Sequence, residues 1–300
     1  MRRIPLLLVL LVAVLAGCGS NEDDRSGASI ALDFQPNAVH AGIYSSPLAP
    51  RVPGSSSDSL KLLASGRTEL AVVDIHDLGL ARERGADIVG VGALVQRPLA
   101  AVIARPGIRR PRDLEGKRVG VTGLPSDDAV LRAVVEHDGG DYSRVKRTTI
   151  GFSAVPTLIT GRVDAVVAFW NAEGVALRQR GVRTREFRVD DYGAPHYPEL
   201  VIATKGSTLR KRRTDIKLAL QDLRHGTVVA LRDRAATIAR IAKASGADEA
   251  LVRAQLDAVG PALVPPVVLD RKALAGWARF DARFGILKRP PDVEKAFPEL

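Results

Sequence analysis

The chain has 300 residues, contains a single cysteine and carries a formal net charge of +10. A body of this length buries roughly three quarters of the surface that its unfolded chain exposes, so the core alone can stabilise it. The densest basic cluster, at residues 210–213, has no interleaved aromatic side chains of the kind that stack on nucleic-acid bases. We therefore expect no nucleic-acid partner, and interpret the positive charge as a solvated face or as attraction to anionic lipid headgroups.

The chain begins with a pattern typical of exported proteins. Arg2 and Arg3 precede an apolar run over residues 6–15, and Leu-Ala-Gly-Cys follows, ending at Cys18. A charged start, an apolar middle and small residues before a cut are the order of a signal peptide. The last four residues resemble the lipobox of bacterial lipoproteins. The resemblance implies cleavage before Cys18, a lipid on its sulfur, and stable anchoring to the cell membrane on its extracytoplasmic side.

We expect residues 1–17 to be the signal peptide and residues 18–28, which are mostly polar, to be a tether between lipid and folded body. The alternative is a membrane-spanning helix over residues 4–17 with a chance cysteine. That stretch is short of the roughly 20 residues that a bilayer requires. Once Cys18 carries a lipid, no thiol remains for a disulfide, a catalytic nucleophile or a metal site.

From residue 29 onward, short apolar runs alternate with helical patterns, which predicts an α/β fold with parallel sheets covered on both faces. A first set of strands is predicted at residues 29–32, 69–73, 88–95 and 100–104, with helices at 60–64 and 76–84. A second set is predicted at residues 118–121, 145–150, 165–169, 187–189 and 200–204, with helices at 127–138, 155–160 and 172–180. From residue 209 the strand signals stop, and three or four helical segments follow.

Two α/β units followed by a helical tail are the plan of two-lobed, hinge-closing binding proteins of the periplasmic type (type II). We expect residues 29–101 and 205–300 to form lobe 1, with the helical tail, and residues 102–204 to form lobe 2. The chain should cross between the lobes near residues 100–104 and 201–204. Ligands in open sheets bind outside the carboxyl ends of the strands, so we expect the site in the cleft between the lobes.

Two blocks are informative about the family: residues 32–44, Leu-Asp-Phe-Gln-Pro-Asn-Ala-Val-His-Ala-Gly-Ile-Tyr, and residues 169–174, Phe-Trp-Asn-Ala-Glu-Gly. They resemble the thiamine-pyrimidine-precursor family, which joins ThiY-like substrate-binding lipoproteins of ABC importers to eukaryotic pyrimidine synthases. Further blocks follow in family order at residues 96–99, 113–120, 161–165 and 190–200. The resemblance covers about residues 29–205. It implies delivery of an aminopyrimidine to an ABC transporter permease.

One segment departs from the family pattern. After the position of Tyr44 the family has a longer helix end, an aromatic-glycine turn and a second strand. Here residues 45–52 alone intervene before Pro53, and Pro47 and Pro50 break any helix. We therefore expect lobe 1 to be shortened, without that strand and without part of that helix.

The candidate ligand-binding residues are those that suit a flat heteroaromatic ring. Aromatic side chains can sandwich the ring, carboxylates can accept from an exocyclic amine, and carboxamides offer both a donor and an acceptor. The expected set is Asp33, Phe34, Asn37, His40, Tyr44, Asp74, Gln96, Trp170 and Glu173. For Phe34 and Tyr44 the alternative is core packing, and for Trp170 we favour the site over the core. Asp33 could instead cap the next turn, and His40 could be an ordinary helix histidine.

The turn at residues 122–126 precedes a helix and could hold an anion. Asp127 and Asp128 occupy the first turn of that helix and would repel an anionic ligand. This argues against sulfonates and against pyridoxal phosphate.

Three functions remain open. The first is a lipid-anchored binding protein for an aminopyrimidine; the second is a binding protein for another small molecule, such as a flavin precursor or a taurine-like sulfonate. The third is an enzyme like the eukaryotic synthases, which carry a cysteine-rich iron-binding motif that a single cysteine cannot supply. No catalytic motif of the Ser-His-Asp, HExxH or Walker type stands out, so we expect no catalytic residues, no metal and no cofactor.

Overall fold

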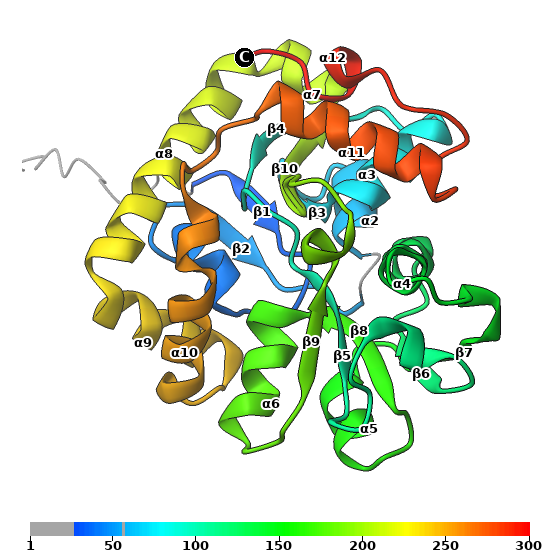
Figure 1. Ribbon diagram of the computed structural model, residues 1–300. Coiled ribbons are helices and arrows are strands. Elements are labelled where there is room, and N and C mark those ends of the chain that lie inside the picture. The colour runs from blue at the N-terminus through cyan, green and yellow to red at the C-terminus, as the bar shows by residue number, and fades with distance from the viewer. Residues whose placement is uncertain (1–26, 56–57) are drawn as a thin grey trace, which may run out of the picture.

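The computed structural model describes residues 27–55 and 58–300. The predicted signal peptide, Cys18 and the tether up to residue 26 lie outside the described residues. The rest of the chain forms two lobes, each built on a five-stranded mixed sheet flanked by helices (Figure 1). The expected α/β fold with two lobes is therefore confirmed. In the described part of the chain, no helix combines the length and the apolar character needed to cross a bilayer.

The first sheet has the strand order β2-β1-β3-β10-β4. Its strands are β1 (Ser29–Ala31), β2 (Ala49–Arg51), β3 (Leu70–Asp74), β4 (Ile88–Ala93) and β10 (Leu200–Lys205). β1 runs parallel to β2 and β3, whereas β10 runs antiparallel to β3 and β4. β3, β10 and β4 are buried along almost their whole length, as expected for strands covered on both faces.

The second sheet has the order β7-β6-β8-β5-β9. Its strands are β5 (Ala100–Ala104), β6 (Arg118–Val121), β7 (Lys146–Thr149), β8 (Ala165–Phe169) and β9 (Arg185–Arg188). β6 runs parallel to β7 and β8, and β5 runs antiparallel to β8 and β9. β5 therefore lies in the second sheet, although β4, the strand before it in the chain, lies in the first. β10 lies in the first sheet, although β9, the strand before it, lies in the second.

Two expectations about these strands are wrong. The sheets are mixed instead of parallel, and residues 200–204 lie in the first sheet instead of completing the second. A parallel connection needs a crossover of a dozen or more residues, usually a helix. β5 and β10 instead enter their sheets from the other lobe, so no such crossover fixes their direction, and each pairs antiparallel with both of its neighbours. The apolar run of β10 does not show which sheet it will join.

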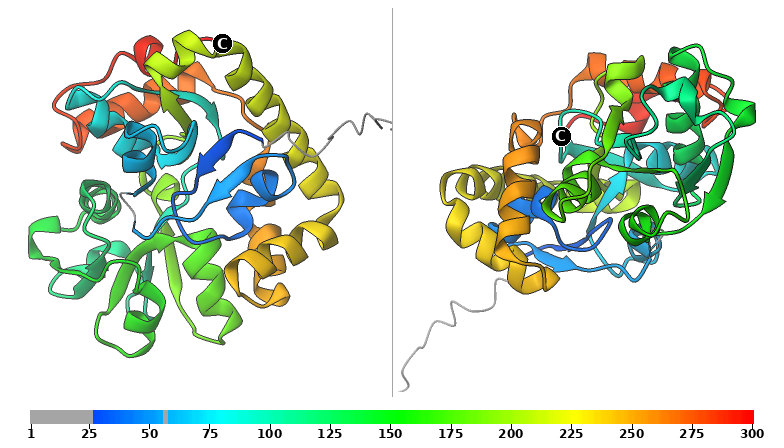
Figure 2. Two further views of the ribbon diagram at one scale, coloured as in Figure 1. Left: turned by 180° about the vertical axis from the view of Figure 1, so that it is seen from behind. Right: turned by 60° about the horizontal axis from the view of Figure 1, so that its bottom comes forward.

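Helices cover both sheets, and the C-terminal third of the chain is helical. In lobe 1 the helices are α1 (Ala41–Tyr44), α2 (Asp58–Ala64) and α3 (Ile75–Glu83), and in lobe 2 they are α4 (Pro125–His137), α5 (Ala154–Ile159) and α6 (Val175–Gln179). The tail contains α7 (Gly206–Lys211), α8 (Arg213–Arg232), α9 (Arg234–Ser245), α10 (Glu249–Val259), α11 (Arg271–Arg283) and α12 (Val293–Ala296). α8 and α9 pack against α1, and α12 packs against β4, so the tail wraps lobe 1 (Figure 2).

The shortened segment after Tyr44 keeps its strand. β2 occupies residues 49–51 at the edge of the first sheet, so the expectation that this strand is missing is wrong. Pro50 has no backbone N–H, and an edge strand tolerates it because one side of such a strand makes no hydrogen bonds to a neighbouring strand. α1 is short and ends at Tyr44. It is held by close packing on α8, where a Cβ added to Gly226 would lie 2.3 Å from the Gly42 carbonyl oxygen.

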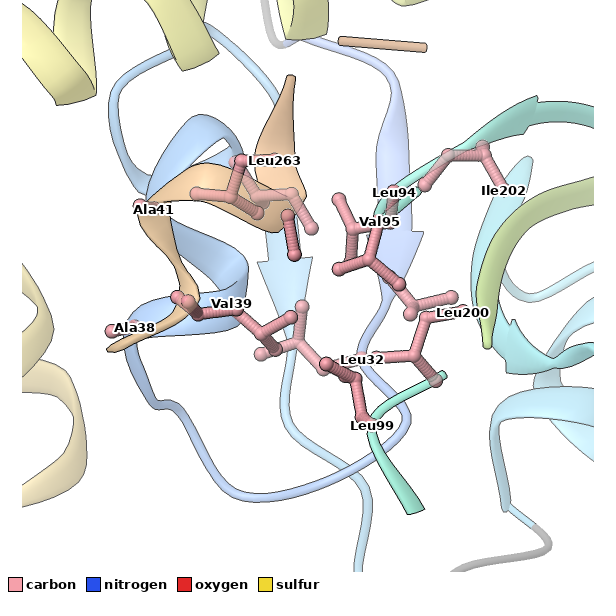
Figure 3. Packing of buried hydrophobic residues seen from close by; sticks show 14 of the residues in the cluster. Leu32, Ala38, Val39, Ala41, Leu94, Val95, Leu99, Leu200, Ile202 and Leu263 are labelled. Carbon is pink, nitrogen blue, oxygen red and sulfur yellow. The ribbon is translucent and has the colours of Figure 1, made fainter. Parts of the chain in front are cut away.

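The main hydrophobic core joins the first sheet, one lobe crossing and the tail. Buried residues from these parts pack together (Figure 3): Leu32, Val39, Leu94, Val95, Leu99, Leu200, Ile202 and Leu263. Because Val95 and Leu99 lie on the first crossing, the core fixes where the chain leaves lobe 1. The site described next therefore has a rigid wall on the hinge side.

Candidate ligand-binding site

A cavity of about 110 Å³ lies between the two lobes, at the carboxyl ends of the parallel strands. Lobe 1 lines it with residues that follow β1 and β3, and lobe 2 with residues that follow β6, β7 and β8. Ala100, Glu199 and Leu200 line it from the ends of the two crossings. The cavity is therefore in the cleft where the sequence analysis expects a ligand.

Carboxylates dominate the polar lining of this cavity. They come from both lobes: Asp33, Asp74, Asp77, Asp127, Glu173 and Glu199. Among the described residues that line the cavity, none is lysine, arginine or histidine. Burial raises the pKa of Asp77 to about 6, and burial also raises the pKa values of Asp127 and Glu173. A ligand that brings positive charge or N–H donors would relieve this burial of negative charge.

Two aromatic rings that line the cavity, those of Phe34 and Phe152, contact each other across the cleft. Phe34 follows β1 in lobe 1, and Phe152 follows β7 in lobe 2. Their ring centroids lie 4.6 Å apart with planes at 89°, an edge-to-face pair that spans the cleft. Phe152 is still 42% exposed. The pair is a contact between lobes that a moving hinge would make and break.

Phe152→Ala is expected to shift the lobes towards an open arrangement. Edge-to-face pairs contribute about 0.5–1.5 kcal/mol beyond their buried area, which corresponds to roughly a two- to tenfold change in the closed-to-open ratio. The radius of gyration from small-angle scattering should rise. Ile159→Ala, at an exposed apolar residue of α5 that does not line the cavity, is the control. Equal radii for Phe152→Ala and the parent protein would contradict the role given to this contact.

Asp33 is oriented by a buried histidine. His40 Nε2 lies 2.8 Å from Asp33 Oδ1, and the Asn37 backbone N–H donates to His40 Nδ1 at 3.3 Å. Because Nδ1 accepts, Nε2 carries the proton and donates it to Asp33. The Asn37 side chain accepts from the Val39 N–H and caps the short turn that carries His40. Asp33, Phe34 and Asn37 line the cavity, whereas His40 does not and contacts Asp33 instead.

Asp127 confirms that the turn after β6 is already occupied by an acid. Its Oδ2 accepts from Thr122 Oγ1 at 2.6 Å and from the backbone N–H groups of Gly123 and Leu124 at 3.0 and 3.2 Å. These three donors, which could otherwise hold an anion, already donate to Asp127. Asp128 does not line the cavity and pairs with Arg147.

Glu173 and Asn171 come from a single π-helical turn, Trp170–Gly174, that follows β8. Glu173 Oε2 accepts the Phe169 N–H at 3.1 Å, and the side chain lines the cavity as predicted. Asn171 is 1% exposed, lines the cavity, and its Oδ1 has no hydrogen-bond partner. A buried acceptor without a partner is costly, so this oxygen is suited to an N–H from a ligand.

Four predicted site residues do not line the cavity: His40, which contacts Asp33, and the three that follow. Trp170 is 3% exposed, donates from Nε1 to the Pro98 carbonyl at 3.1 Å, and lies under the guanidinium of Arg188. β8 ends at Phe169, which lines the cavity, and Trp170 is the first residue of the π-helical turn, where these contacts hold its ring outside the cavity. Gln96 donates instead to the carbonyls of Pro265 and Val268. Tyr44 packs against the main core, the alternative that the sequence left open.

Asp74 begins α3 at the end of β3 and lines the cavity as predicted. Its Oδ1 accepts the His76 N–H at 2.8 Å. Behind it His76 Nδ1 lies 2.6 Å from Asp281 Oδ1, and Nε2 lies 3.1 Å from the Tyr197 hydroxyl. Burial alone lowers the pKa of His76, but the charges of Asp281 and Asp74 outweigh it and raise the pKa to about 10.

The sequence analysis missed several residues of this site. Asp77, Phe152, Asn171 and Glu199 all line the cavity. Asn171 stands inside a block that carries the family resemblance, and Asp77 lies three residues after Asp74 on the next helix, so both had a local signal. Glu199 also stands inside a family block, at residues 190–200, whereas Phe152 follows β7 without a motif, and its place in the cavity depends on how the two lobes meet.

Residues 49–236 match the family described as NMT1/THI5 like. The chain belongs to this family. Among its curated relatives is a formylaminopyrimidine-binding protein from Halalkalibacterium halodurans, 34% identical over an alignment that covers 65% of this chain and 64% of the relative. Another is a putative thiamine biosynthesis protein from Haemophilus influenzae, 32% identical, with 54% of this chain and 52% of the relative covered. The match thus spans about half to two thirds of the length of these relatives.

Solved structures agree on the fold of this NMT1/THI5-like protein. The alkanesulfonate-binding protein SsuA from Xanthomonas axonopodis pv. citri superposes with a TM-score of 0.75 at 18% identity, covering 92% of this chain and 99% of that one. A similarity at this level of identity shows the two-lobed binding-protein fold. The resemblance to the thiamine-pyrimidine-precursor family and the expected fold class are both confirmed.

Proposed function

We propose that this protein is an extracytoplasmic solute-binding protein that captures an aminopyrimidine, a thiamine precursor, and delivers it to an ABC transporter permease. The observation that carries the proposal is the composition of the cavity: six carboxylates and three phenylalanines, with no basic side chain among its described lining residues. A 4-aminopyrimidine brings a flat ring, an exocyclic amine and a ring nitrogen that can be protonated. Each of these has a counterpart in the cavity.

The residues that match these features of the ligand come from both lobes. Phe34, Phe152 and Phe169 offer apolar faces and edges to it. The carboxylates of Asp33 and Glu173 accept N–H donors, and charge-assisted bonds of this kind are about twice as strong as neutral ones. The unpartnered Oδ1 of Asn171 is a further acceptor. The similarity to a formylaminopyrimidine-binding protein supports the same ligand class.

The alternatives fit the cavity less well. A sulfonate would meet six acidic side chains and no arginine, although solved sulfonate-binding proteins share the fold. An enzyme like the eukaryotic synthases would need a cysteine-rich iron motif, whereas the chain has one cysteine. The acidic lining also disfavours the phosphate of pyridoxal phosphate. We therefore infer that the protein binds and does not transform its ligand.

The location that we propose follows from the N-terminal sequence. Leu-Ala-Gly-Cys resembles a lipobox, so Cys18 would carry the lipid anchor that keeps the protein at the cell membrane. The polar segment up to residue 28 would then tether the lobes close to the permease.

A thermal-shift screen tests the proposed ligand class. The purified protein is heated with 4-amino-5-hydroxymethyl-2-methylpyrimidine, its N-formylaminomethyl analogue, riboflavin, taurine or an alkanesulfonate. A ligand at 100 times its Kd stabilises the native state by about 2.7 kcal/mol, which raises Tm by several degrees. We expect the aminopyrimidines alone to do so. Stabilisation by a sulfonate or by riboflavin, with none by the pyrimidines, would reject the proposed ligand.

A further inference from the structure

One side chain ties together the two segments that join the lobes. Glu199 ends the second crossing, and its Oε2 accepts the backbone N–H of Leu99 at 2.8 Å and of Ala100 at 3.1 Å, where the first crossing ends. Glu199 is 1% exposed. A shielded carboxylate that accepts two backbone donors makes strong hydrogen bonds, whose strength depends on its negative charge. The hinge therefore contains a charge-dependent link.

The same carboxyl group is linked to the cavity. A carboxylate oxygen of Glu199 lies within 4.8 Å of a carboxylate oxygen of Asp74, and both residues line the cavity. Two carboxyl groups can hydrogen-bond to each other when one of them holds a proton. Burial, together with the charges of Glu199 and Asp77, raises the pKa of Asp74 well above its usual range. Two buried carboxyl groups this close cannot both ionise without a large cost, so one of them holds a proton in the empty cavity, and the raised pKa of Asp74 assigns it to that residue.

The surrounding charged groups leave this proton in place. From α3, His76 and Asp77 face the pair, and from α11 Asp281 faces His76. Burial raises the pKa of Asp74 more than the charge of His76, whose Nε2 lies 3.8 Å from Glu199 Oε1, lowers it. Asp281 offsets part of that charge as the ion-pair partner of His76. Tyr197, next to Glu199 on the second crossing, hydrogen-bonds to His76, and burial raises the pKa of its hydroxyl well above the usual value. The net negative charge beside the pair comes from Asp77, which favours retention of the proton.

We propose that the Asp74–Glu199 pair couples occupation of the cavity to the hinge. A ligand N–H that bonds to Asp74 displaces the proton of Asp74 into solvent, and the Glu199 carboxylate, whose charge is then no longer shared with that proton, holds the Leu99 and Ala100 amides more tightly. Binding thereby strengthens the link between the two crossings and releases a proton. The ligand half of this mechanism rests on the proposed function; the link between proton and hinge does not.

The link between proton and hinge is tested on the full-length protein without ligand. Raising the pH removes the proton of Asp74 directly, so protection of the Leu99 and Ala100 amides from hydrogen exchange, corrected for intrinsic chemistry, should rise about tenfold. Asp74→Asn, which has no proton to lose, should show protection that does not change with pH. Asp127→Asn alters another cavity acid that has no contact with the hinge, and it should retain the rise. Protection independent of pH in the parent protein, or an unchanged rise in Asp74→Asn, overturns the coupling.

The ligand half is tested by calorimetry with 4-amino-5-hydroxymethyl-2-methylpyrimidine in two buffers of equal pH and different ionisation enthalpy. The parent protein should release about one proton more per bound ligand than Asp74→Asn does. Equal release by both proteins overturns the displacement step. Absence of binding by the parent protein rejects the proposed ligand and with it the displacement step, while the exchange experiment decides the hinge link separately.

Discussion

Glu173→Gln is expected to weaken binding of a 4-aminopyrimidine by about ten- to a hundredfold. Glu173 lines the cavity from the π-helical turn after β8. Hydrogen bonds to a charged group contribute about 1.5–3 kcal/mol, and each 1.4 kcal/mol is a factor of ten in Kd. An analogue whose amine is replaced by hydrogen has no donor at that position for Glu173 and should lose little. Calorimetric titration of both ligands measures the difference.

The folded state itself should not be weakened by Glu173→Gln. Burial raises the pKa of Glu173 above its value in the unfolded chain, so its ionised form costs stability at neutral pH, and a neutral glutamine removes that cost. Asp128→Asn, an acid of α4 that lies outside the cavity lining, is the control for a general change in charge. Equal losses for the two ligands would remove Glu173 from amine recognition, and no loss for either would move the site elsewhere.

Asp281→Asn is expected to lower the free energy of unfolding by about 3–5 kcal/mol, because it leaves the buried His76 without its counter-charge. The two side chains are fully buried and lie 2.6 Å apart. Chemical denaturation with urea measures the loss. Asp270→Asn, which keeps a good cap at the start of the same helix, should cost much less.

The pH dependence of stability supplies an independent check of this ion pair. The pKa of His76 is raised from 6.5 in the unfolded chain to about 10 in the folded protein. Its contribution is therefore fully present below pH 6.5 and is lost as the pH rises through about 10. In Asp281→Asn the slope of the free energy of unfolding against pH should be flatter between pH 6.5 and 10. An unchanged slope would show that His76 is not held in its charged form by Asp281.

Much of the site could be predicted because strand ends are visible in sequence. Asp33, Phe34 and Asn37 follow β1, Asp74 follows β3, and Glu173 follows β8; each lines the cavity. The prediction failed at Trp170. Phe169, the last residue of β8, lines the cavity, whereas Trp170 begins the π-helical turn and its ring is held by the Pro98 carbonyl and by Arg188. A motif locates the end of a strand but not the face to which each side chain points.

The sequence by itself determined the alternation of strands and helices, the two lobes and the family, because these follow from local periodicity and from contiguous motifs. The tertiary structure alone decided which sheet β10 joins, since its buried run suits either one. It also decided the partnership of His76 with Asp281, 205 residues apart, and of Glu199 with Leu99, 100 residues apart. Such contacts depend on how the lobes and the tail pack against one another, and no local pattern records that packing.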